Sequence, residues 1–457
     1  MKTITNLGRR TLSVLALSSL ALSVSAAVSP EEAATLQTTL TPIGAERAGN
    51  AAGTIPQWTG GLARDAAAVD ANGFYADPFA ADQELFTVTA ANIEQYKDQL
   101  SPGQQAMFAR YPETYRMRVY PSRRSNTVPQ EVFDAVARNA VNTVTAEGGN
   151  GLENFDTAYP FPIPKSGVEA VWNHIARYRG GSFARTIAQA TPQANGSNTM
   201  AVLQDEFTFA TALNDYGPAI SDNLMFYFTQ RILSPSRLAG DVLLVHEFIN
   251  QVREPRLAWI YNAGQRRVRR APQVAYDGPA FGSDGTRTSD NYDFYNGSPD
   301  RYEWKLIGKR EMLIPYNNYR IASKDVKYSE IVQAGHINQD LVRYELHRVW
   351  EVEAVLREGQ RHVYAKRHLF INEDNWQASA VDHYDGRGGL WRVAESIAMQ
   401  RFDHMVPSYA IETLYDLQNG RYVALGMTNE ERRNYDFNFS GASADFTPNA
   451  LRASGIR

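Results

Sequence analysis

The chain has 457 residues, a formal net charge of -4 and no cysteine. Its hydrophobic content of 43%, with 11% aromatic residues, is typical of a globular protein and excludes an intrinsically disordered chain. The lack of cysteine excludes disulfide bonds and a lipid-modified N-terminal cysteine, and the acidic balance argues against nucleic acid as a partner.

The N-terminus has the three parts of a cleavable signal peptide. Lys2, Arg9 and Arg10 form a positive segment, an apolar run covers residues 12–24, and small residues up to Ala26 fit a cleavage site. Export to the periplasm is therefore predicted, by the general secretory route or, because of the paired arginines, by the twin-arginine route. Cleavage takes the formal charge from -4 to about -7, since three basic and no acidic residues leave. No second apolar run is long enough to span a bilayer.

Residues 27–165 are predicted to form an N-terminal region of short helices and extended segments that packs on the main domain. Residues 41–82 show little periodicity and are expected to be an extended arm. The sequences Ser101–Gln104 and Thr127–Gln130 each have the spacing of a capping box, which predicts a helix start at each.

Residues 166–457 are predicted to form the main domain, of α+β class. A capping box at Ser166 and apolar residues at helical spacing predict a helix over 166–178. Strand patterns follow, and the clearest is 342–356, in which apolar and charged side chains alternate. Long antiparallel strands with one apolar face predict a curved sheet wrapped around that helix, with an apolar concave interior that suits a ligand.

Several motifs, in this order along the chain, resemble the domain of unknown function 1329 (DUF1329) family. They are Gly53–Gly61 (GTIPQWTGG), Pro160–Pro164 (PFPIP), Trp172–His174 (WNH), Trp259–Tyr261 (WIY) and Arg266–Arg270 (RRVRR). The resemblance implies a fold similar to the periplasmic lipoprotein carriers LolA and LolB, an incomplete antiparallel barrel capped by helices. It also implies work on lipid, lipoprotein or other hydrophobic cargo, beside an inner-membrane exporter or an outer-membrane protein. It carries over no catalytic residues.

The residues themselves predict neither a catalytic nor a metal site, and no cofactor. There is no G-x-S-x-G elbow, H-E-x-x-H motif or P-loop. His347, His362 and His368 could meet across a hairpin and bind a metal, but their spacing is not diagnostic and favours a polar outer face of the sheet. The sequence Asp382–Asp385 allows acid–base chemistry, yet its place before a glycine-rich turn favours turn formation.

Four clustered arginines, Arg266, Arg267, Arg269 and Arg270, form a second candidate site. On a strand, Arg266 and Arg270 would share a face with Val268, so cationic groups would border apolar surface. Guanidinium groups there could bind an anionic headgroup or a protein partner. The alternatives are ion pairing within the fold, or a strand at the sheet edge that charge protects from aggregation.

The main hypothesis is a carrier with an aromatic-rich cavity. An acyl chain buried there would gain about 0.8 kcal/mol per methylene, so a sixteen-carbon chain could approach roughly 12 kcal/mol before ordering costs. A non-enzymatic accessory subunit of an envelope export complex is the first alternative, and a hydrolase of hydrophobic esters is the second. The candidate cavity residues are Trp172, Trp259, Trp304, Tyr344, Leu346, Trp350 and Val352.

Overall fold

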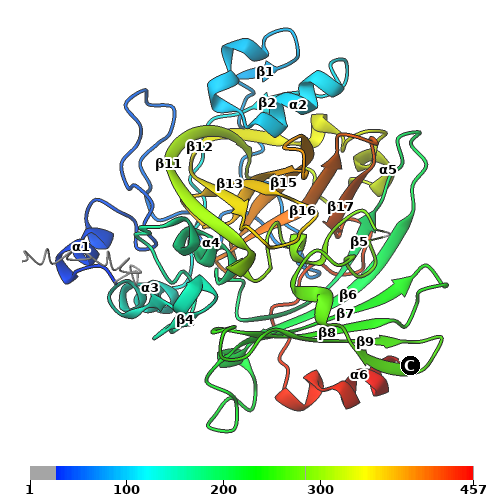
Figure 1. Ribbon diagram of the computed structural model, residues 1–457. Coiled ribbons are helices and arrows are strands. Elements are labelled where there is room, and N and C mark those ends of the chain that lie inside the picture. The colour runs from blue at the N-terminus through cyan, green and yellow to red at the C-terminus, as the bar shows by residue number, and fades with distance from the viewer. Residues whose placement is uncertain (1–26, 284, 456–457) are drawn as a thin grey trace, which may run out of the picture.

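A computed structural model describes residues 27–283 and 285–455, so the predicted signal peptide lies outside the described residues. Two consecutive antiparallel meanders form most of the structure (Figure 1). The first consists of β5 (Ser182–Ala190), β6 (Met200–Phe209), β7 (Leu224–Ser234), β8 (Val242–Phe248), β9 (Leu257–Asn262) and β10 (Arg267–Arg270). The second consists of β11 (Tyr302–Pro315), β12 (Arg343–Leu356), β13 (Lys366–Asn372), β14 (Ala378–Tyr384), β15 (Leu390–Arg401), β16 (Val406–Asp416) and β17 (Tyr422–Met427).

The two meanders form one sheet, because β17 pairs with β5. Two short strands, β1 (Phe86–Val88) and β2 (Met117–Val119), extend this sheet, with β2 parallel to the start of β12. The end strands β10 and β11 do not pair with each other in the described part of the chain. The prediction of an α+β fold with a curved, incompletely closed antiparallel sheet is confirmed, apart from this one parallel pairing.

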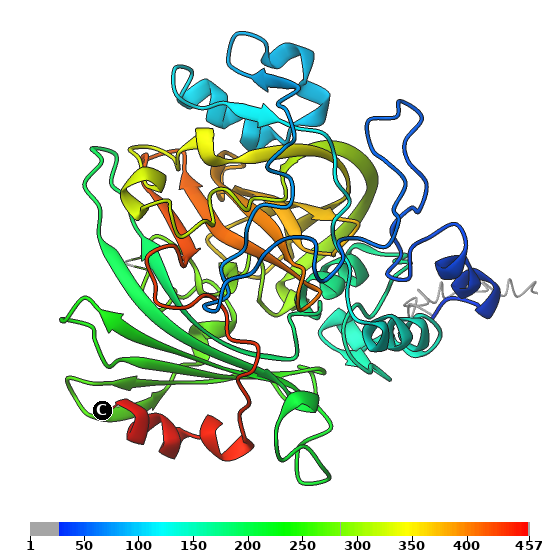
Figure 2. The ribbon, with the colours of Figure 1, turned by 180° about the vertical axis from the view of Figure 1, so that it is seen from behind.

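Helices cover the two faces of the sheet. The short helix α1 (Pro30–Ala33) contacts α3 (Gln130–Asn142), and the small pair β3 (Val144–Thr145) and β4 (Leu152–Glu153) follows α3. Helix α5 (Tyr328–Ile331) lies between β11 and β12 in the chain. Helix α6 (Pro448–Gly455) packs on β8 and β9, below the first meander in Figure 2. Within the described residues no helix is both long enough and apolar enough to cross a membrane.

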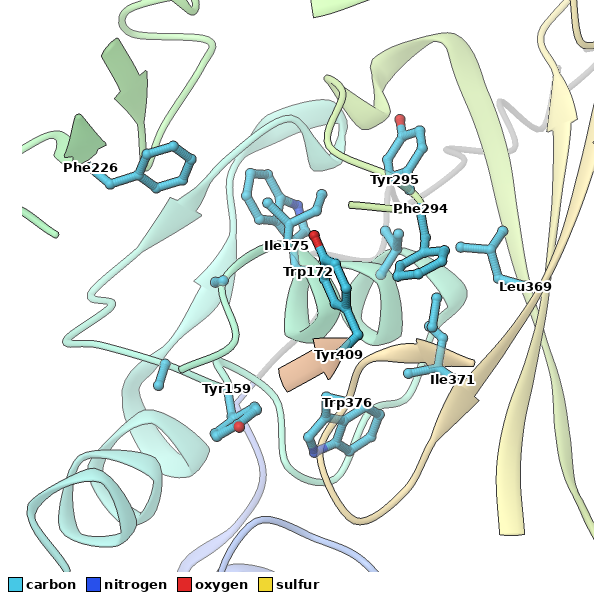
Figure 3. Packing of buried hydrophobic residues seen from close by; sticks show 14 of the residues in the cluster. Tyr159, Trp172, Ile175, Phe226, Phe294, Tyr295, Leu369, Ile371, Trp376 and Tyr409 are labelled. Carbon is cyan, nitrogen blue, oxygen red and sulfur yellow. The ribbon is translucent and has the colours of Figure 1, made fainter. Parts of the chain in front are cut away.

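Helix α4 (Gly167–Ile175) is the predicted central helix, and it lies on β11 and β12. The Ser166 side chain caps its first turn, as the sequence predicts. Trp172 and Ile175 project into a core shared with both meanders, beside Leu369 and Tyr409 (Figure 3). The helix ends at Ile175, earlier than predicted.

Hydrogen bonds from two arginine side chains explain the early end of α4. Arg177 donates to the carbonyl of His174 at 2.8 Å, and Arg179 donates to the carbonyl of Ile175 at 3.0 Å. These bonds satisfy carbonyls that a further turn would otherwise have used. Both guanidinium groups then reach Asp293 in the segment between the meanders.

The face of β12 that carries alternating charges is buried at its first half, whereas a polar outer face exposed to solvent was expected. The backbone N–H of Arg123 donates to Glu345 at 2.7 Å, and Asn317 donates to the same carboxylate at 2.9 Å. The N-terminal region therefore covers the outer face here. The extended arm is held by Ile55 and Trp58, which are both buried.

The capping box at Ser101 is confirmed, and it starts α2 (Pro102–Arg110). The second expected box does not form, because α3 begins at Gln130 after Pro129, which makes no side-chain capping bond. Thr127 is instead buried, and its carbonyl accepts a bond from Gln400 at 2.9 Å.

Replacing Gly103 with alanine should destabilise the protein, although alanine normally favours a helix by about 1 kcal/mol over glycine. The first turn of α2 packs so closely on β14 that an added Cβ would lie 2.0 Å from Oδ1 of Asp382. We expect a loss of about 1–3 kcal/mol in the free energy of unfolding, measured by urea denaturation. Gly386→Ala is the control, since a Cβ there meets nothing within 4 Å. Equal midpoints for the two variants would contradict the close contact.

Candidate functional site

A cavity of about 260 Å³ lies on the concave face of the first meander. Because side chains alternate across a strand, residues from one face of β5–β9 point into it. The apolar residues that these strands contribute are Phe183, Phe207, Phe226, Phe228, Leu243, Val245 and Ile260. This volume is just below the range of about 300–1,000 Å³ typical of small-molecule sites.

The segment between β10 and β11 forms the opposite wall. Val274, Pro279, Ala280 and Phe281 add further apolar surface from this segment. It is attached to the first meander by a bond of 2.7 Å from the side chain of Gln189 on β5 to the carbonyl of Gly282. The start of β16, with Val406 and Tyr409, also lines the cavity, which therefore lies between both meanders and the loop segment that connects them.

Five arginines and one aspartate also line the cavity, namely Arg177, Arg179, Arg185, Arg256, Arg287 and Asp293. Asp293 pairs with Arg177 and, at 2.8 Å, with Arg179. Burial alone would raise the pKa of Asp293, but the two guanidinium groups outweigh it and hold the pKa well below its ordinary value. This buried cluster fixes the end of α4 to the loop segment.

The backbone at Asp293 and Phe294 is strained, with φ angles of 56° and 67°. Such left-handed conformations are costly for residues other than glycine and persist only where surrounding contacts enforce them. His174 supplies one contact, at 2.9 Å from its Nε2 to the carbonyl of Asp293. Burial lowers the pKa of His174 to about 3, so the ring is neutral and donates this bond.

Two further arginines of the cavity are fully paired. Arg185 donates to Asp205 and to the hydroxyl of Tyr292, each at 2.8 Å. Arg256 donates to Glu247 at 2.5 Å and to the backbone carbonyl of Asn296 at 2.7 Å. Their charges are therefore neutralised inside the fold.

The seven predicted cavity residues lie elsewhere, and none is among the described residues that line this cavity. Four of them surround α4 in the main core: Trp172, Trp304, Trp350 and Val352. Tyr344 and Leu346 belong to a second core on the side of α2, and Trp259 lies on the convex face with residues of α6. As ligand contacts they stay a prediction.

Part of the cavity wall is marked in the sequence by the positions of its phenylalanines and arginines, and not by the size of single residues. Phenylalanines at 207, 226 and 228 share one face of two paired strands, whereas the tryptophans are scattered among core elements. The cationic residues Arg177, Arg179 and Arg185 follow the end of α4 within ten positions. No periodicity marks Arg287, which lies in the irregular segment.

The predicted arginine cluster lies at the end strand β10, and none of its residues lines the cavity, although Arg269 pairs with the cavity residue Ile260. Arg267, Arg269 and Arg270 are exposed, and Arg266 is in the preceding turn with φ 53°, not on the strand. Arg270 lies 5.0 Å over the ring of Trp259. This position fits the alternative of a charged sheet edge, and a role in binding a headgroup or a partner stays a prediction.

The three histidines considered for a metal do not come together. His347 faces Glu345, His368 faces Glu351 at 2.8 Å, and His362 precedes β13 and contacts Asp290 at 3.0 Å. Among the described residues no group of three or more histidine, cysteine or acidic side chains could hold a metal ion.

Asp382 and Asp385 have different roles. Asp385 accepts bonds from the backbone of Arg387 and Gly389, as expected of a turn residue. Asp382 is instead buried on β14 and accepts bonds from Ser101 and the backbone of Gly103 at 3.1 and 2.8 Å. Burial raises the pKa of Asp382 to about 7. These contacts indicate a structural role for Asp382, because its carboxylate binds the start of α2.

Comparison with solved structures gives distant similarities. A putative outer membrane lipoprotein-sorting domain from Vibrio parahaemolyticus is 14% identical, with a TM-score of 0.43, and the match covers 63% of this chain and 98% of that one. A DUF1329 family protein from Desulfovibrio piger is 12% identical, with a TM-score of 0.41, over 59% and 91% of the two chains. A LolA superfamily protein from Nitrosomonas europaea is 13% identical, with a TM-score of 0.37, over 62% and 98%.

Sequence comparison gives a strong match. An uncharacterized protein of Pseudomonas aeruginosa is 64% identical over 444 residues, which are 97% of this chain and 98% of that protein. The model of the family described as "Protein of unknown function (DUF1329)" matches residues 87–452. The chain therefore belongs to the DUF1329 family.

Proposed function

We propose that this protein is an exported, periplasmic binding protein that carries a hydrophobic molecule, such as a lipid or the acyl chain of a lipoprotein. The observation that supports the proposal is the cavity between the concave sheet and the 274–296 segment, with its wall of phenylalanines. Each methylene buried there would contribute about 0.8 kcal/mol to the free energy of binding. Binding of this kind requires apolar surface and no reacting group. The role proposed is therefore binding and transfer, not catalysis.

The predicted signal peptide supports a location outside the cytoplasm. A chain without cysteine has no site for N-terminal lipid attachment, so a released domain could diffuse between two membranes. An inner-membrane exporter or an outer-membrane protein would then be the donor or the acceptor of the cargo. These partners belong to the proposal.

Filling the cavity should abolish binding of an apolar probe. Ile260 on β9 lines the cavity, and Ile260→Trp would place a larger ring in the space that the ligand needs. We expect at least tenfold weaker binding of N-phenyl-1-naphthylamine, measured by fluorescence titration of the processed protein. Ile307→Trp makes the same change at an exposed position and should bind the probe like the wild type.

Native mass spectrometry of protein purified from its own periplasm is the second measurement. A co-purifying hydrophobic molecule that is lost from Ile260→Trp but kept by Ile307→Trp would support the proposal. Protein that carries no such molecule and binds no apolar probe would contradict it.

A further inference from the structure

Arg287 differs from the other arginines of the cavity. It is only 3% exposed, yet its Nε and Nη1 atoms have no hydrogen-bond partner among the described residues. Its nearest carboxylate oxygen is Oε1 of Glu412, at 3.7 Å from Nη1, which is too long for a hydrogen bond. Buried charges in folded proteins are normally paired, so a guanidinium left unsatisfied at a cavity wall indicates a place for a missing acceptor.

Glu412 does not fill that place. Its Oε2 already accepts a bond of 3.0 Å from the backbone N–H of Asp293, and its Oε1 has no partner among the described residues. Burial raises the pKa of Glu412 to about 7, although Arg287 acts in the opposite direction. The raised pKa weakens the compensation that this carboxyl offers to the charge of Arg287.

The unsatisfied cation directly borders the apolar wall. The guanidinium of Arg287 lies 4.9 Å over the ring of Tyr292, and this ring lies 5.5 Å from the ring of Phe228 on β7. The hydroxyl of Tyr292 is held by Arg185 and Asp205, so the ring is fixed between the polar and apolar parts of the cavity. A molecule bound here would meet a cation and a phenylalanine wall within a short distance.

We infer that the cargo is an amphiphile with an anionic headgroup, a carboxylate or a phosphate, and that Arg287 binds this headgroup while the chain lies along the phenylalanines. The N–H groups of a guanidinium donate charge-assisted hydrogen bonds that either anion can accept. The inference rests on the proposed function, since it names the class of molecule that the cavity carries. It places the headgroup contact in the cavity and not at the exposed arginines of β10.

The test compares ligands that share a chain and differ in the headgroup. Dodecanoate, dodecyl phosphate, dodecanol and dodecyltrimethylammonium are titrated by calorimetry, below their micellar concentrations, into the processed protein. We expect both anions to bind at least tenfold more tightly than the alcohol, and the cation to bind most weakly. In Arg287→Gln the anions should lose this advantage, whereas the alcohol should bind as before.

Arg270→Gln is the matched control, because Arg270 is exposed on β10 and pairs with Trp259 on the convex face, outside the cavity lining. It should leave all four affinities unchanged. The inference is overturned if the anions bind no better than dodecanol, if their advantage survives in Arg287→Gln, or if Arg270→Gln removes it. If Arg287→Gln fails to fold, the ligand comparison on the wild-type protein still tests the anionic headgroup, and a preference for the alcohol would overturn the inference.

The same titrations separate the inference from the proposed function. Dodecanol and N-phenyl-1-naphthylamine report on the apolar cavity alone. If both bind and the anions gain nothing, the carrier proposal stands and the anionic headgroup is wrong. If neither ligand binds, both proposals are wrong.

Discussion

Asp293→Ala should lower the free energy of unfolding by about 3–5 kcal/mol, since it removes one partner of a buried ion-pair cluster. Arg177 and Arg179 would keep their charges in a buried site without the carboxylate that both contact. The strained backbone at residue 293 would also lose the side-chain bonds that help to enforce it. Urea denaturation followed by circular dichroism measures the loss.

Asp222→Ala provides the matched control. Asp222 forms an ion pair with Arg253 at 2.8 Å, but both side chains are largely exposed. Water screens this pair, so its loss should leave the unfolding midpoint close to that of the wild type. If Asp293→Ala shifts the midpoint no more than Asp222→Ala does, the buried cluster is not a structural centre of the fold.

Trp172→Ala should lower the free energy of unfolding by a similar amount, about 3–5 kcal/mol, because it removes a large apolar side chain from the core. Its ring is fully buried in the core around α4, and its Nε1 donates to the carbonyl of Gly149 at 2.9 Å. Truncation leaves a void that a packed sheet on several sides cannot close, and it leaves that carbonyl without its donor. The urea midpoint is again the measurement.

Trp259→Ala makes the same substitution on the convex face, where the side chain is only partly buried. Its effect on stability should be clearly smaller, and Trp172→Phe should lie between the wild type and Trp172→Ala. A Trp172→Ala protein as stable as Trp259→Ala would contradict the placement of this ring in the main core.

The sequence allowed the curved sheet and the central helix to be predicted because both depend on local patterns. The alternation over 342–356 marks β12, and the capping box at Ser166 marks the start of α4. The sequence did not reveal that the first half of the outer face of β12 is buried, because the backbone of Arg123, which covers Glu345, lies more than 200 positions earlier in the chain. Charged side chains on one face of a strand indicate a solvent-exposed face only where no other segment of the chain covers that face.

The residues that the sequence favours as cavity contacts differ from those that line this cavity, for a related reason. Size favours the tryptophans, but large rings also fill space, and four of the candidates, three of them tryptophans, lie in the core around α4. The open space lies where the two meanders and the segment between them meet, and this arrangement depends on which strands pair. The pairing of β17 with β5 and the position of Arg287 have no local signal.

That pairing also sets the order in which the protein can fold. Ala424 on β17 pairs with Ala190 on β5, and the two are about 230 residues apart in the chain. Pairings between such distant segments close large loops and are slow to form, so the two meanders can each assemble early while the joint between them comes last. If the protein is exported as proposed, the edge of β5 stays unpaired until β17 has crossed the membrane. During that interval it is the segment most exposed to wrong partners, and a periplasmic chaperone would have most to protect there.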